Sequence, residues 1–214
     1  MRVRSIVGVL CAAVLAAAPC TFAQMGGKPA EKPAAKPAAK AAAKPAEGAA
    51  MAAPKPAPEM AQLKFFDGSW TCNGDSPATP MGPAQKTKSA VKSHTAMNGF
   101  WQAGTVSMSS PAMSMEGMFH ITYDPAAKQY VMLWMDNMGG YAQQTSPGWD
   151  GDKVVYTGEG SMMGQKMQAR DTFIKNSDGS FKHTSEAQMN GQWTSMGEET
   201  CKKAAPAPAA AAKK

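Results

Sequence analysis

Polar and apolar residues alternate along the middle of the chain, and a period of two predicts β-strands. The positions that share one face of a strand are Met115, Gly117, Phe119, Ile121 and Tyr123. Asp124-Pro125 ends this strand in a tight turn, because proline has no N–H for the ladder of hydrogen bonds. The segment 130–136 carries apolar residues on both faces, so we expect it to lie centrally in a sheet.

The same pattern continues to Cys201 and predicts an all-β domain. The expected strands, about ten in number, begin at Trp70 and continue at 86–97, 100–109, 115–123, 130–136, 140–145, 153–160, 166–175, 181–189 and 192–201. Asp178-Gly179 and Asn190-Gly191 predict hairpins, since tight turns need a positive φ. A short helical turn is expected at 60–66. Regular strands joined by hairpins indicate an antiparallel up-and-down barrel, which leaves no open sheet edge.

The start of the chain has the layout of a secretory signal peptide. Arg2 and Arg4 precede an apolar run at 6–18, and Thr21-Phe22-Ala23 follows it, which predicts cleavage after Ala23. The apolar run is too short for a membrane-spanning helix, which needs roughly 20 residues. We therefore expect an exported protein, periplasmic or secreted, with no transmembrane segment in the mature chain.

Low-complexity Ala, Pro and Lys segments flank the predicted domain. Such segments contain too few apolar groups to offset the entropy of ordering, so we expect them to be disordered. The expected organisation is a signal peptide at 1–23, a linker at 24–59, the barrel at 60–202 and a tail at 203–214.

The positive charge of the chain lies outside the predicted domain. The whole chain has a net charge of +6, yet the segment 60–201 carries thirteen acidic and ten basic side chains. A folded nucleic-acid site places its positive charge on the domain, with aromatic residues for stacking. We therefore expect no nucleic-acid partner. The Lys-rich flanks instead suit contact with anionic envelope components, or they simply solvate the protein.

Two of the four cysteines, Cys72 and Cys201, remain after the predicted cleavage. An oxidising compartment favours a disulfide between them. Cys72 lies in the first expected strand and Cys201 ends the last, and these strands are neighbours in a closed barrel. Counting by twos places Cys72 on the face of Trp70 and Cys201 on the face of Trp193. The alternative is two unpaired thiols.

Several short fragments, in a fixed order, carry a resemblance to a known family. They are Phe66-x-Gly68-x-Trp70, Asn98-Gly99-Phe100, Met118-Phe119, Tyr123-Asp124, Lys128-x-Tyr130, Trp134-x-Asp136 and Gly139. From Leu63 to Cys201 the chain resembles the bacterial domain-of-unknown-function 1579 family. The resemblance implies a lipocalin-like barrel with an internal cavity, and it implies no reaction. The long linker and the cysteine pair depart from that family.

An apolar barrel interior suits a small hydrophobic or amphipathic ligand. The residues expected to line it are Trp70, Trp101, Phe119, Tyr123, Met132, Trp134, Asp136 and Trp193. The alternative is a filled core, as small barrels can be packed solid. Asp136 needs either a partner such as Arg170 or a solvent-facing position at a strand end. The function expected is ligand binding; the alternative is a packed, non-catalytic envelope protein whose cationic tails make the contacts.

Other chemistry finds less support in the sequence. Met113-x-Met115-x-x-Met118-x-His120 offers soft ligands for Cu(I), but Met115 and Met118 fall on opposite strand faces, so we name no metal site and no cofactor. The histidines are scattered and no nucleophile motif is present, so we name no catalytic residue and expect no enzyme. The Gly68-x-Trp70 start is also similar to nitrobindin, a haem barrel whose iron-binding histidine lies in the last strand; 192–201 contains none.

Overall fold

The computed structural model describes residues 53–79 and 82–204. The predicted signal peptide, most of the linker and most of the tail lie outside the described residues. The elements are the 3₁₀ segments η1 (Pro58–Phe66) and η2 (Met97–Gly99) and the strands β1 (Gly68–Ser76), β2 (Gln85–Ala96), β3 (Trp101–Ser109), β4 (Ser114–Asp124), β5 (Gln129–Asp136), β6 (Tyr141–Ser146), β7 (Trp149–Asp150), β8 (Lys153–Met162), β9 (Gln165–Lys175), β10 (Phe181–Met189) and β11 (Gln192–Lys203).

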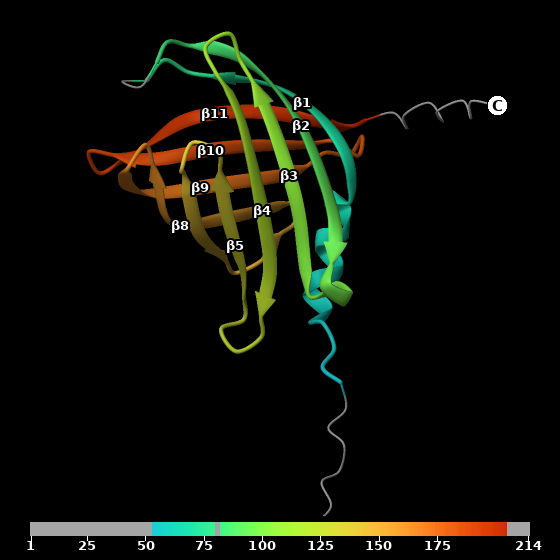
Figure 1. Cartoon of the computed structure of the whole chain (residues 1–214). Helices are drawn as coiled ribbons and strands as arrows, with labels where there is room; N and C mark the ends of the chain where they lie inside the picture. The colour runs from blue at the N-terminus through green and yellow to red at the C-terminus, as the bar shows by residue number, and fades with distance from the viewer. Residues whose placement is uncertain (1–52, 80–81, 205–214) are drawn as a thin grey trace, which may run out of the picture. The chain divides into compact units, whose positions relative to one another are not determined.

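The strands form one closed antiparallel barrel, which confirms the predicted fold class. Each strand pairs with its neighbours in sequence, apart from the short β7, and β6 pairs directly with β8. The first and last long strands, β1 and β11, also pair with each other. Figure 1 shows the long strands β1 to β4 curving across the front of the barrel, with β8 to β10 behind them. β5 pairs with β4 on one side and β6 on the other, but its outer face is not covered, since Met135 is exposed.

Turn residues end the strands where the sequence placed them. Asn190 and Gly191 have φ of 51° and 79° and join β10 to β11. Met163 and Gly164 have φ of 51° and 77° and join β8 to β9 in the same way. Positive φ at both central residues is the requirement of a type I′ hairpin, whose twist matches that of the strands. The Asn190-Gly191 prediction is confirmed.

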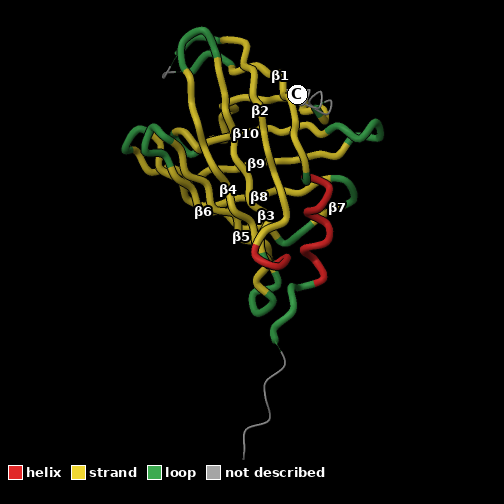
Figure 2. Tube along the Cα trace, turned by 45° about the vertical axis from the view of Figure 1, so that its right-hand side comes forward, coloured by secondary structure: helices red, strands yellow, loops and turns green. Residues whose placement is uncertain are grey.

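The segment η1 closes one end of the barrel; it is the longer of the two red segments in Figure 2. Its Leu63 is fully buried. Phe66 packs against three aromatic rings from three strands: Trp149 of β7, Phe173 of β9 and Phe181 of β10. The carbonyl of Phe66 accepts a hydrogen bond of 2.8 Å from Nε1 of Trp70. The predicted helical turn is thus present as a 3₁₀ helix that begins at Pro58, two residues before the expected domain boundary.

The apolar core fills only the half of the barrel next to η1. Its members are Met60, Leu63, Phe66, Trp70, Cys72, Ile121, Tyr130, Met132, Val154, Tyr156, Phe181 and Cys201. The C-terminal end of the domain also lies in this half, where the Ala204 N–H donates to the Ser69 carbonyl at 2.8 Å. No helix in the described residues is long and apolar enough to cross a membrane.

Cys72 and Cys201 form a disulfide across the β1–β11 pair, as predicted. They are direct register partners, and both side chains are fully buried. The bond therefore joins the two strands that close the barrel, and it links positions separated by 129 residues.

Candidate functional site

The inner face of the barrel can be read from the register of the strands, because directly paired residues share a face. Cys72, Cys201 and Phe181 are paired in this way and lie in the core, so the residues two positions along each strand also face inward. In the half away from η1, most inward positions are partly exposed, although Thr87 and Ala187 remain buried. We call this part of the interior the open half.

A chain of polar side chains crosses the barrel between the core and the open half. Ser89 Oγ donates to Glu199 Oε2 at 2.8 Å, and Gln144 Nε2 donates to Asp171 Oδ2 at 2.7 Å. Between the two carboxylates lies His183, whose Nε2 is 2.8 Å from Asp171 Oδ1 and whose Nδ1 is 3.3 Å from Glu199 Oε1. These five residues come from β2, β6, β9, β10 and β11. We call them the inner network.

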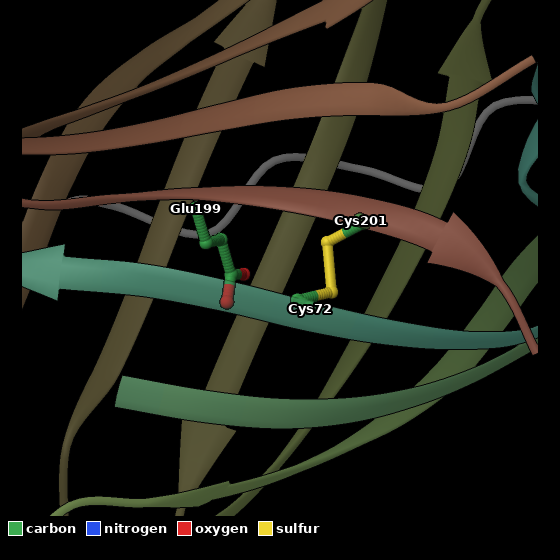
Figure 3. A group of neighbouring side chains, drawn as sticks. All are labelled: Cys72, Glu199 and Cys201. Atoms are coloured by element: carbon green, nitrogen blue, oxygen red, sulfur yellow. A yellow bond between two sulfur atoms is a disulfide. The ribbon is translucent and has the colours of Figure 1, made fainter. Parts of the chain in front are cut away.

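The inner network lies inside the barrel but is not sealed from water. The side chains of His183, Asp171 and Glu199 are 22%, 19% and 18% exposed. One face of the His183 ring is covered, because it stacks on Phe173 with ring centroids 4.5 Å apart and 8° between the planes. Figure 3 shows the Glu199 side chain beside the Cys72–Cys201 disulfide, between β11 and β1. The core and the disulfide thus form a rigid support beneath these ionisable groups.

The two carboxylates hold His183 in its charged form. Burial by itself would lower the pKa of His183, but the hydrogen bonds and negative charges of Asp171 and Glu199 outweigh it and raise that pKa to about 9. Burial would raise the pKa of Glu199, yet the contact with His183 and the Ser89 hydroxyl lowers it overall. At neutral pH His183 is therefore an imidazolium that donates from both ring nitrogens. The inner network carries one positive and two negative charges.

Aromatic rings line the wall of the open half beside this network. On the inner face, Phe119 lies over Gly104 of the neighbouring strand, and Trp134 lies over Gly117. A Cβ atom at either glycine would collide with the ring that covers it. Glycine at these two positions lets the rings lie flat against the sheet. Both aromatic side chains are only partly buried, so they present apolar surface to the interior.

Asp136 lies at the end of β5, on the inner face at the rim of the open half. Its carboxylate accepts hydrogen bonds from Trp134 Nε1 at 3.1 Å and from the backbone of Met138 and Gly140 at 2.9 and 2.8 Å. Asp136 thus lies at a strand end, as one of the two alternatives had it, but it is partly buried on the inner face instead of facing solvent. Arg170 is not its partner, because it pairs with Glu186 on the outside of the barrel.

Of the other predicted lining residues, Phe119 and Trp134 face the open half, whereas Trp70 and Met132 belong to the filled core. Tyr123 also faces inward, at the η1 end, with its ring 5.2 Å from that of Tyr130. The structure thus contains a packed core in one half and partly exposed inward side chains in the other.

Trp101 and Trp193 lie on the outer face, so the expectation that they line the interior is corrected. Trp101 directly precedes the inward Gln102, and its ring contacts that of His120 outside the barrel. Trp193 is displaced by a β-bulge opposite Ser185 and Glu186, where β11 contains an extra residue. The extra residue reverses the alternation between Cys201 and Trp193. On the outer face the Arg170 guanidinium therefore stacks over Trp193, with its Cζ 4.3 Å from the centroid of the Trp193 ring.

Sequence reasoning missed the inner network. Each ionisable residue lies two positions from an inward core residue of its own strand: His183 from Phe181, Asp171 from Phe173 and Glu199 from Cys201. That spacing was the available signal, because it places all three on the core face. The candidate copper motif is divided between the two faces, as expected from its parity: Met115 faces inward, while Met118 is exposed outside.

Two surface hollows lie elsewhere, at the η1 end of the barrel. Their volumes are about 590 and 620 Å³, and Lys, Pro and turn residues make up most of their linings. Neither includes a residue of the inner network or an aromatic residue of the open half. The ionisable groups inside the barrel therefore remain the stronger candidate for function.

Comparison with known proteins agrees with this fold. The family "Protein of unknown function (DUF1579)" matches residues 55–203. The chain belongs to the DUF1579 family. No curated protein matches it. The crystal structure of Rv2717c from M. tuberculosis is similar with a TM-score of 0.54 and 13% sequence identity, over 71% of this chain and 100% of that one. At that identity the likeness shows the barrel fold of this DUF1579 protein and nothing further.

Proposed function

We propose that this DUF1579 protein binds a small amphipathic molecule in the open half of its barrel. The observation that carries the proposal is the inner network: ionisable side chains inside a barrel, 18–22% exposed, with aromatic rings beside them. Binding sites of small molecules are mostly apolar, with a few polar groups that fix orientation. The apolar part of the ligand would lie against Phe119 and Trp134, and its polar part would meet Asp171, His183 or Glu199.

The test is native mass spectrometry of the protein purified from its own cells, followed by organic extraction of any molecule that accompanies it. A stoichiometric small molecule is the expected result. The Trp134→Ala variant should fold and lose the ligand, because the ring forms part of the inner wall. Trp101→Ala is the matched control, since it removes the same side chain from the outer face. Equal retention by both variants, or no retained molecule and no competition by apolar probes, contradicts the proposal.

We also propose that the protein is exported. The signal-like start of the chain and the disulfide between Cys72 and Cys201 support this, because structural disulfides persist in oxidising compartments. Export predicts a mature protein that begins at Gln24 and has no titratable thiol. N-terminal sequencing and thiol titration of the native protein measure the two features separately. A protein that retains Met1 and stays in the cytoplasm contradicts export and leaves the ligand proposal standing.

A further inference from the structure

The charges on the inner face of the open half are unequal. Asp136, Asp171 and Glu199 face inward with a single cation, His183. Every lysine and arginine of the described strands either faces outward or lies at the η1 end. Two of these, Lys175 and Lys203, share the inner face but lie over Trp149 and Trp70 beside the core. Within the described residues, the open half therefore has a negative net charge.

In the part of the chain that the structure describes, lysine and arginine side chains of β9 and β10 form ion pairs on the outer face of the barrel and none on the inner face of the open half. Lys182 pairs with Glu198 and Arg170 with Glu186, and all four side chains face away from the interior. Glu198 and Glu199 are consecutive residues of β11 on opposite faces. These two outer carboxylates each have their own Lys or Arg partner, whereas Asp171 and Glu199 share one histidine. An anionic ligand would meet net repulsion inside.

A second, independent observation is an unsatisfied acceptor beside the carboxylates. Gln144 is 1% exposed, and its Oε1 has no hydrogen-bond partner among the described residues. Its amide orientation is fixed, because Nε2 must be the atom that donates to Asp171 Oδ2. The hydroxyl of Tyr156, 1% exposed and next to Asp171 across the β8–β9 pair, also lacks a partner there. An unpaired buried acceptor is costly and calls for a donor.

We propose that the open half selects molecules with a cationic nitrogen on an aromatic or apolar body. The cation would lie between Asp171 and Glu199 on the open side of His183, where an N–H donor can reach the Gln144 side of the network. Trp134 and Phe119 would contact the body and the cation, since aromatic faces attract cations. This inference rests on the proposed function and adds the charge of the ligand to it.

The experiment compares three probes of similar shape: benzylammonium, which carries N–H donors, the neutral analogue benzyl alcohol and the anion benzoate. Binding to the full-length protein is measured by NMR titration at low ionic strength. We expect the cation to bind about tenfold more tightly than the anion, as one net charge at close range can produce. The preference should weaken in high salt, because ions screen partly exposed charges.

Variants locate the effect. Asp171→Asn with Glu199→Gln should abolish the preference for the cation, whereas Glu198→Gln, which removes the adjacent carboxylate on the outer face, should leave it unchanged. If the double variant does not fold, intermolecular NOEs in the native protein replace it. Contacts from the methylene and ring protons of benzylammonium to His183, Phe119 and Trp134 support the proposal, and contacts to outer-face residues alone overturn it.

The remaining outcomes separate the two proposals. Binding of the neutral or anionic probe in the interior, as tightly as the cation, overturns the charge preference and leaves the proposed function intact. If none of the three probes binds and no retained ligand is found, the charge preference and the proposed function fail together. A cation preference that the Glu198→Gln variant loses equally would assign it to the outer surface and overturn the inference.

Discussion

Nε2 of His183 lies 2.8 Å from Oδ1 of Asp171, and this contact joins strands β9 and β10 inside the barrel rather than at its surface. The second ring nitrogen reaches Glu199 on β11. One imidazolium therefore connects three consecutive strands and lies between two carboxylates that would otherwise repel each other. Its protonation state couples the stability of the barrel to pH.

The free energy of unfolding should fall as the pH rises from about 6.5 to about 9. The pKa of His183 is about 9 in the folded protein, against 6.5 for the free side chain. Below pH 6.5 the residue is charged in both states, so its stabilising contribution is complete. Between the two pKa values only the folded state keeps the proton, and above pH 9 the contribution of about 3 kcal/mol is lost. Urea unfolding at a series of pH values measures this.

The control for that prediction is a pair of histidine variants. His183→Gln should remove the pH dependence between 6.5 and 9, and His120→Gln, on the outer face, should retain it. NMR titration of the imidazole carbons gives the pKa of His183 directly. A value near 6.5 would contradict the charged state assigned to it.

Removal of His183 should be more costly than removal of an outer histidine. His183→Ala leaves Asp171 and Glu199 together without a cation, and breaking a buried charge network by removing one partner costs about 3–5 kcal/mol. The expectation for His120→Ala is a change below about 1 kcal/mol. Thermal and urea unfolding compare the two variants. Equal effects would show that the inner network adds little to stability.

Loss of the disulfide should lower stability by up to about 5 kcal/mol, because the bond joins Cys72 to Cys201, 129 positions apart, and so closes a long loop in the unfolded chain. Cys72→Ser with Cys201→Ser should therefore melt well below the oxidised protein. Reductant should lower the melting temperature of the oxidised protein and leave that of the double variant unchanged. Two free thiols in the native protein would refute this expectation.

Gly117→Ala should displace the Trp134 ring from the wall of the open half. The added methyl group collides with that ring, and overpacking of this kind costs about 1–3 kcal/mol. Gly160→Ala is a milder comparison, since the nearest atoms lie 3.3 to 3.6 Å from its added Cβ. The cost of Gly117→Ala should largely vanish in the Trp134→Ala background. A double-mutant cycle followed by urea unfolding measures the coupling; purely additive costs would mean that the two residues do not meet.

The fold was predictable because its signals are local. Alternation gave the strands, and Asn190-Gly191 gave a hairpin without reference to the rest of the chain. The inner network was not predictable in the same way, since Ser89 and Glu199 are 110 residues apart and meet only when β1 and β2 close against β11. Trp193 was misplaced because one extra residue in β11 reverses the alternation, and counting by twos did not allow for a bulge beside Gly197.

The hydrogen bond between Ala204 and Ser69 holds the end of the last strand beside the start of the first. Residue 204 and the segment that enters η1 lie on the closed side of the barrel. A tether fused directly at residue 204, or directly before η1, would join the domain on that side, whereas the inner network lies toward the other half. Fusion at these two positions should therefore leave the open half unobstructed.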